Sequence, residues 1–118
     1  MEVLWEDQER INEFSKLNSR ITGLRAALQK HEQEKEYLGD VEMELEMLDE
    51  EERVQYKIGE AFIYLQQREA LERVERDGRV VNEEIEETER QISEVGGEMS
   101  TLKGLLYGKF GTSINLEA

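Results

Sequence analysis

Few side chains in this sequence have the type and spacing that catalysis or metal binding requires. His31 is the single histidine of the chain, and Lys35 follows one helical turn later. A histidine that binds a metal needs partner ligands, and the chain has no second histidine and no cysteine. Both residues lie on a heptad seam, where polar side chains set the register of the helices or extend to solvent. We therefore interpret them as structural residues and expect no metal site.

Paired acidic residues offer a second kind of chemistry. The neighbouring pairs Glu83-Glu84 and Glu86-Glu87 could act as acid and base, but most of them fall outside the heptad seam, on a solvated helix face. The sequence brings together no set of nucleophile, base and orienting group. We therefore expect no catalytic residues and no enzymatic activity.

The glycines near the C-terminus suggest nucleotide or membrane binding only at first sight. Gly108-Lys109 has the form of a phosphate-loop ending, but Lys103 stands where that motif needs its first glycine and Phe110 replaces its serine or threonine. Gly104 and Gly108 also fit G-x-x-x-G, although no apolar span of ~20 residues surrounds them. We expect no nucleotide or other cofactor.

The composition of the chain argues against further classes of function. The formal net charge is −14, 37% of the residues are charged and proline is absent, which is typical of long helices. Residues 40–53 alone carry −7. Such an acidic chain is a poor nucleic-acid binder. No apolar run of ~18 residues could span a membrane, and no basic and apolar leader is visible. We expect a soluble cytoplasmic protein.

Two long stretches have the alternating three-and-four spacing of a coiled coil. The first seam is mainly apolar, and the second keeps its spacing over about five heptads. The seam positions are Phe14, Leu17, Ile21, Leu24, Leu28, His31, Lys35 and Leu38 in the first run, and Leu71, Val74, Gly78, Val81, Ile85, Thr88, Ile92, Val95, Met99, Leu102 and Leu106 in the second. Gly96, Gly97, Gly104 and Gly108 should make the end of the second helix softer than its start.

Between the two runs the apolar period changes to two. Val54, Tyr56 and Ile58 alternate with polar neighbours, which predicts a half-buried strand. Gly59 then supplies a turn, and residues 61–65 are apolar on both faces. The stretch is therefore typical of a β-hairpin.

The element order predicts a mainly α fold, in which a β-hairpin joins the helices of a long antiparallel two-helix coiled coil. We expect one domain over residues 1–118, with helices at about 6–48 and 67–109, a hairpin at about 54–65 and a C-terminal tail at 110–118. An isolated hairpin is marginal in water and has two open edges, so we expect it to join a β-barrel built by several subunits. The residues expected at this oligomer interface are Val54, Tyr56, Ile58, Gly59, Phe62, Ile63, Tyr64 and Leu65.

Apolar side chains also gather at both ends of the sequence, which an antiparallel pair brings together. Phe14 and Leu106 fit ordinary seam packing, but the residues beyond the regular heptads cannot all be buried by one partner helix. An exposed apolar patch on a charged protein is typical of a binding site. The residues expected there are Leu4, Trp5, Ile11, Leu105, Tyr107, Phe110, Ile114 and Leu116.

Three motifs carry a resemblance to a known family. They are WEDQERINEFSKLNSRI at 5–21, YKIGEAFIYL at 56–65 and LYGKFGTSINLE at 106–117. With them the whole chain resembles β-class subunits of the prefoldin family, and one subunit type within that class in particular. Two departures are Gln55, where a proline is frequent, and the glycines at 96 and 97, where helix formers are usual.

The resemblance implies a heterohexamer of two α-type and four β-type subunits whose hairpins form a double β-barrel. It also implies ATP-independent capture of unfolded or nascent polypeptides, of the actin and tubulin class, by the coiled-coil ends. The captured chains would pass to the cytosolic group II chaperonin.

A second hypothesis from a different class is a structural coiled-coil scaffold or adaptor, whose ends bind one folded partner. The two hypotheses differ in promiscuity, because a scaffold would not suppress the aggregation of unrelated denatured proteins.

Overall fold

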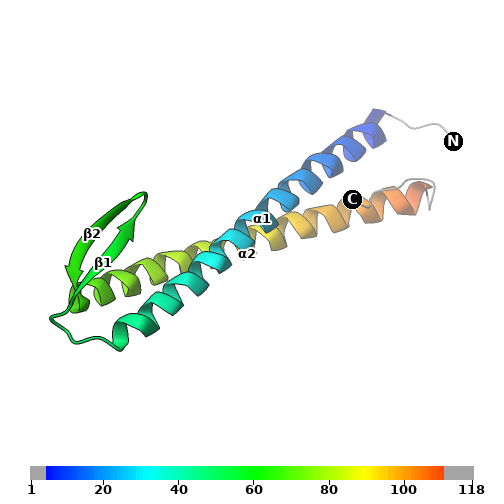
Figure 1. Ribbon diagram of the computed structural model, residues 1–118. Helices are drawn as coiled ribbons and strands as arrows, with labels where there is room; N and C mark the ends of the chain where they lie inside the picture. Colours follow the sequence, from blue (N-terminus) through cyan, green and yellow to red (C-terminus); the bar gives the residue numbers. More distant parts are fainter. Residues whose placement is uncertain (1–4, 111–118) are drawn as a thin grey trace. The chain divides into compact units, whose positions relative to one another are not determined.

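Along the chain, a β-hairpin lies between two long helices. The computed structural model describes residues 5–110, apart from the side chains of Ile58, Lys109 and Phe110. The elements are α1 (Trp5–Glu46), β1 (Arg53–Ile58), β2 (Ala61–Gln66) and α2 (Gln67–Phe110), as Figure 1 shows. The fold class predicted from the sequence, two long helices joined by an antiparallel hairpin, is thereby confirmed.

The ends of α1 follow from local chemistry. Glu6 and Asp7 occupy its first turn, where negative charge interacts favourably with the helix dipole. The helix ends at Glu46, two residues before the expected position. The amide of Leu48 donates to the carbonyl of Leu45 at 3.1 Å, three residues back, which tightens the chain after the last helical turn.

The chain divides into two compact units. The first unit contains residues 1–28 and 87–118, and the second contains residues 29–86. In the first, α1 and α2 pack in opposite directions. Phe14 clusters with Leu106, and Ile21 clusters with Val95. These residues are at most 6% exposed, as expected for seam positions.

The second unit holds the hairpin with the adjoining parts of both helices. Its buried apolar side chains come mainly from the predicted seams, but Leu45 and Ala70 lie outside the seam positions named from the sequence. Buried apolar residues of this unit are Leu38, Leu45, Tyr56, Ala70, Val74, Val81 and Ile85.

Strands β1 and β2 form a two-stranded antiparallel sheet with a two-residue turn. The register pairs Tyr56 with Ile63 and Lys57 with Phe62. Gly59 begins the turn at a φ of +59°, a left-handed conformation that side-chain-bearing residues rarely adopt. Each strand extends one residue beyond its expected outer end.

Candidate functional site

The two faces of the hairpin differ in what covers them. Residues that pair directly across a sheet share a face. Val54 with Leu65 and Tyr56 with Ile63 are therefore two pairs on one face, and all four are buried or half-buried. Pairs such as Lys57 with Phe62 lie on the other face, which is exposed. We refer to these as the inner and the outer face of the hairpin.

A hydrogen bond between strand and helix anchors the inner face. The Tyr56 hydroxyl donates to the Asp77 carboxylate of α2 at 2.7 Å. The Arg73 guanidinium lies 6.0 Å from the centroid of the same ring. Burial, followed by the hydrogen bond to Asp77, raises the pKa of Tyr56 well above the ordinary value of 10.0. The tyrosine is therefore a neutral donor under all physiological conditions.

A second set of hydrogen bonds closes the base of the hairpin. Gln67, the first residue of α2, is 5% exposed, and its side-chain amide donates to the Leu45 carbonyl at 2.8 Å. Its backbone amide donates to the Glu52 carbonyl at 2.7 Å. One glutamine thus joins the ends of both helices to the segment that precedes β1.

The outer face presents aromatic side chains to solvent. Phe62 is 59% exposed and Tyr64 is 64% exposed. Beside them, Gln55 donates to the Tyr64 hydroxyl at 3.5 Å, and the Arg53 guanidinium lies 5.9 Å from the Tyr64 ring centroid. An exposed aromatic pair rimmed by polar groups has the composition of a protein interface.

The hairpin also has backbone groups available for pairing. The sheet has two strands, so each has one edge without a neighbouring strand among the described residues. Such edges are templates for pairing with another chain. The outer face and the two edges are therefore the parts of the hairpin that remain available for contact with another chain.

The first unit offers a different surface, where α1 begins and α2 ends. Phe14 and Leu106 form a buried cluster, with Ile11 and Tyr107 packed against it and partly buried. Trp5 is 73% exposed and Leu105 is 51% exposed. The Lys103 ammonium lies 5.4 Å from the Tyr107 ring centroid. This end therefore combines a small core with two large apolar side chains in solvent.

The predicted binding residues are only partly placed by the structure. Leu4, Ile114 and Leu116 lie outside the described residues, and so does most of the expected tail. Phe110 ends α2, but its side chain, like that of Ile58 in the hairpin, is not described. Trp5 and Leu105 are exposed as a binding role requires, whereas Ile11 and Tyr107 contribute part of their surface to the cluster.

Sequence reasoning did not identify Asp77 or Gln67. Both are polar residues in an acidic, charge-rich helix, where a solvated position is the ordinary interpretation. The position of Gln67 directly after a strand is the signal that could have indicated a role at the hairpin base. For Asp77, three residues beyond the seam position Val74, the pattern contains no comparable signal.

Comparison with known proteins gives a consistent result. A family model described as "Prefoldin subunit" matches residues 8–113. The chain is similar to prefoldin subunit 4 of Saccharomyces cerevisiae, with 42% identity over 116 residues that cover 98% of this chain and 90% of the yeast protein. It is also similar to prefoldin subunit 4 of Homo sapiens, with 34% identity over 117 residues that cover 98% of this chain and 87% of the human protein.

Among solved structures, the fold is similar to the prefoldin beta subunit from Thermococcus strain KS-1. The TM-score is 0.80, and the match covers 91% of this chain and 94% of the other at 13% identity. At this identity the likeness concerns the fold. Over residues 5–110, neither helix has a stretch that is both long and apolar enough to cross a bilayer.

Proposed function

Given that this chain belongs to the prefoldin subunit family, and so has a co-chaperone role, we propose that it holds unfolded and nascent polypeptides without ATP. In this proposal it works in the cytoplasm as one β-type subunit of a heterohexamer, with two α-type and further β-type subunits. The held chains, of the actin and tubulin class, then pass to a group II chaperonin. This role needs no catalytic residue.

Assembly through the hairpin is supported by its outer face and its edges. Phe62 and Tyr64 are exposed, and a neighbouring strand that covers them would remove their apolar surface from water. This burial contributes a favourable free energy of about 25 cal/mol per Å². Backbone pairing at the strand edges adds hydrogen bonds and fixes the register. A barrel built from the hairpins of several subunits would satisfy both requirements.

One observation supports client holding: Trp5 and Leu105 are exposed in the same unit that contains the Phe14 cluster. An unfolded polypeptide exposes scattered apolar segments, and each such surface binds one of them weakly. Several subunits on one frame raise the effective concentration of binding surfaces, so the complex can hold a client through many weak contacts. Weak contacts also permit release by transfer.

The test is suppression of aggregation by the assembled complex. Trp5→Ser with Leu105→Ser should reduce the protection of unrelated denatured proteins severalfold, because it removes the two exposed apolar side chains and leaves the cluster in place. The matched control is Met47→Ser with Val80→Ser, two exposed apolar residues of the second unit, which should keep full protection.

Complex mass is measured for both variants, so that loss of assembly is distinguished from loss of binding. Full protection by the Trp5/Leu105 variant in an intact complex would contradict client binding at this surface. Protection of a single folded partner, with none for denatured proteins, would favour the scaffold role instead.

A further inference from the structure

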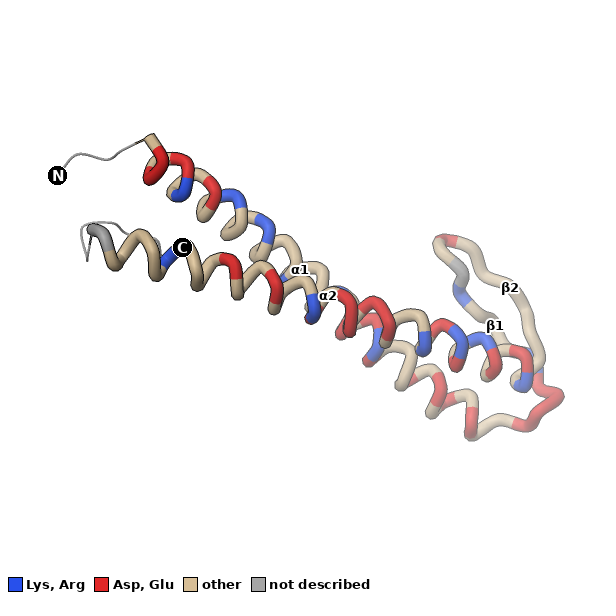
Figure 2. The backbone as a smooth tube through the Cα atoms, turned by 180° about the vertical axis from the view of Figure 1, so that it is seen from behind, with Lys and Arg blue, Asp and Glu red and all other residues tan. Residues whose placement is uncertain are grey.

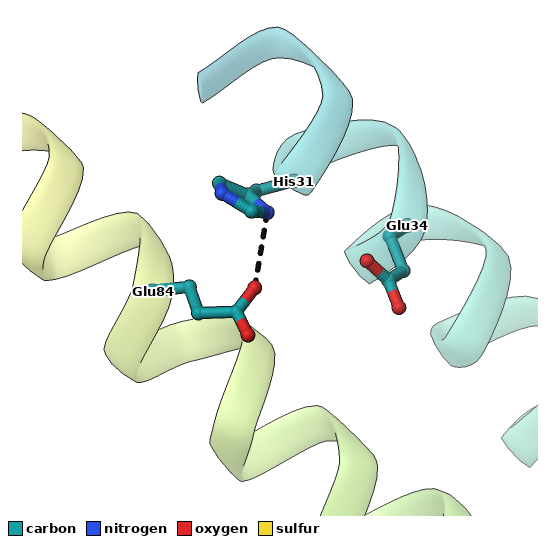
Figure 3. A group of neighbouring side chains, drawn as sticks. All are labelled: His31, Glu34 and Glu84. Carbon is teal, nitrogen blue, oxygen red and sulfur yellow. Dashed lines mark ion pairs between the residues drawn. The ribbon is translucent and has the colours of Figure 1, made fainter. Parts of the chain in front are cut away.

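The single histidine of the chain has partners that sequence spacing did not reveal. His31 of α1 is half-buried, and its Nδ1 atom lies 3.1 Å from a carboxylate oxygen of Glu84 in α2. Glu34, one helical turn after His31, points toward the same place, as Figure 3 shows. Ligand atoms of all three residues lie within 4.8 Å of one another. All three belong to the second unit.

This geometry is close to that of a metal ligand set. With metal–ligand bonds of about 2.0–2.2 Å, two ligands of a tetrahedral ion are separated by roughly 3.3–3.6 Å. The separation of His31 and Glu84 is already close to that range. Glu34 is exposed and its side chain is long, so a rotamer change can bring its carboxylate to the third position.

We propose that His31, Glu34 and Glu84 bind a divalent transition-metal ion that connects α1 to α2 within the second unit. One imidazole with two carboxylates suits zinc and its neighbours in the first row, whereas magnesium and calcium prefer oxygen ligands alone. Three protein ligands leave a further coordination position for water.

The electrostatic environment favours a cation at this place. The second unit has nineteen acidic and eight basic residues, or −11 of the total of −14. Figure 2 shows the concentration of acidic residues along α1 and its connection to β1. Summed negative charge raises the local concentration of cations near a site.

A metal would also compensate for a weak section of the coiled coil. The first seam is apolar up to Leu28, but its next two positions are His31 and Lys35, and Lys35 is exposed. Polar residues at seam positions specify register at a cost in stability. A metal held by ligands from both helices would stabilise the pairing where apolar contacts are missing.

The experiment uses the full-length chain labelled with ¹³C at its histidine. Because the chain has one histidine, the imidazole signals report on His31 without ambiguity. Titration with Zn²⁺ should shift these signals along a saturable one-to-one curve and raise the thermal unfolding midpoint. Glu84→Gln and Glu34→Gln should each weaken Zn²⁺ binding about tenfold or more, and His31→Gln should abolish the increase in the midpoint.

Glu32→Gln is the matched control, because it removes the same charge from an exposed position on the same helix. It should leave Zn²⁺ affinity within about twofold. The helical circular dichroism of each variant establishes that it is folded. Absence of saturable binding below millimolar Zn²⁺ would overturn the proposal, as would equal weakening by Glu32→Gln and Glu84→Gln. Glu84 lies in α2, far from His31 in sequence, so weaker Zn²⁺ binding by Glu84→Gln shows that the ion binds the folded pair of helices.

Discussion

At the scale of single residues, the most informative contact is the one between Tyr56 and Asp77. It connects the inner face of the hairpin to α2, although 21 positions separate the two residues in sequence. A hydrogen bond to a charged group contributes about 1.5–3 kcal/mol to the free energy of unfolding, more than a hydrogen bond between neutral groups. Because the Tyr56 ring is buried, disrupting this bond is more costly still. The Tyr56 hydroxyl is therefore one of the groups that place the hairpin in its unit, together with Gln67 at the base.

Tyr56→Phe tests this dependence, because it removes the hydroxyl and keeps the ring. We expect the free energy of unfolding to fall by about 1–2 kcal/mol, since Asp77 loses a donor in a partly buried place. Tyr64→Phe is the control. Its hydroxyl is exposed and accepts a long bond from Gln55, so the loss should stay below about 0.5 kcal/mol. Urea unfolding measures both, and equal losses would contradict the anchoring role of Tyr56.

A second prediction at this scale concerns Glu87 on the exposed face of α2. Hydrogen bonds from Arg90, and then from Gln91, lower the pKa of Glu87 to about 2. Because the pKa of Glu87 is lower in the folded state, its interaction with Arg90 stabilises the fold fully above about pH 4.5. This stabilisation is lost as the pH falls toward 2 and Glu87 is protonated. In Arg90→Gln the pKa of Glu87 should move up toward 4.5. Titration of the glutamate side-chain NMR signals measures it, and an unchanged pKa would contradict the assigned cause.

At the scale of elements, the sequence pattern predicts the helices and strands well because each period is local. Heptad spacing identified Phe14, Ile21 and Val95 as seam residues, and all three are buried. Gly59 was correctly placed in the turn, since few other residues adopt its backbone conformation. The motifs also correctly indicated the similarity to prefoldin subunit 4.

What the pattern did not predict depends on contacts between elements. Asp77 and Glu84 look like ordinary solvated acids in sequence, and their partners, Tyr56 and His31, lie on other elements. Side-chain hydrogen bonds across elements leave no period in the sequence, so pattern reasoning cannot detect them. The role predicted for the two termini remains a prediction: Leu4, Ile114 and Leu116 lie outside 5–110, and the exposure of Trp5 and Leu105 alone does not test it.

Helix α2 passes through Gly96 and Gly97 without interruption. A Cβ atom added at Gly97 would meet no atom within 4 Å outside the helix backbone, so no packing requires a glycine there. Gly97→Ala should therefore increase the free energy of unfolding by about 0.5–1 kcal/mol. Gly59→Ala is the contrasting variant and should destabilise the hairpin, because its φ is +59°. Thermal unfolding compares them, and destabilisation by Gly97→Ala would show that this glycine has a structural role.

At the scale of the whole molecule, the two units differ in charge and in the surface that each presents. The acidic second unit carries the hairpin, and the nearly neutral C-terminal stretch belongs to the first unit. Like charges repel within a Debye length of about 8 Å, so the acidic helices of neighbouring subunits would not collapse onto one another. Under the proposed function, assembly and client binding therefore use separate parts of the chain.

Phe62→Asp tests the assembly surface. The side chain is 59% exposed, so the isolated chain should keep its helical content. In a barrel built with partner subunits the same position would be covered, and an unpaired buried carboxylate is strongly destabilising, by about 3–5 kcal/mol. We expect the variant to remain outside the complex when it is mixed with α-type and other β-type prefoldin subunits. Native mass spectrometry distinguishes a free chain from a hexamer.

Val80→Asp is the matched control, because Val80 is 48% exposed but belongs to α2 and not to the outer face of the hairpin. It introduces the same charge outside the two strands that would form the proposed barrel, so this variant should assemble with the ordinary mass. Normal assembly of Phe62→Asp would mean that the outer face of the hairpin stays in solvent, and would contradict its role in joining subunits. Failure of both variants would instead indicate that added negative charge alone prevents assembly, since the second unit is already strongly acidic.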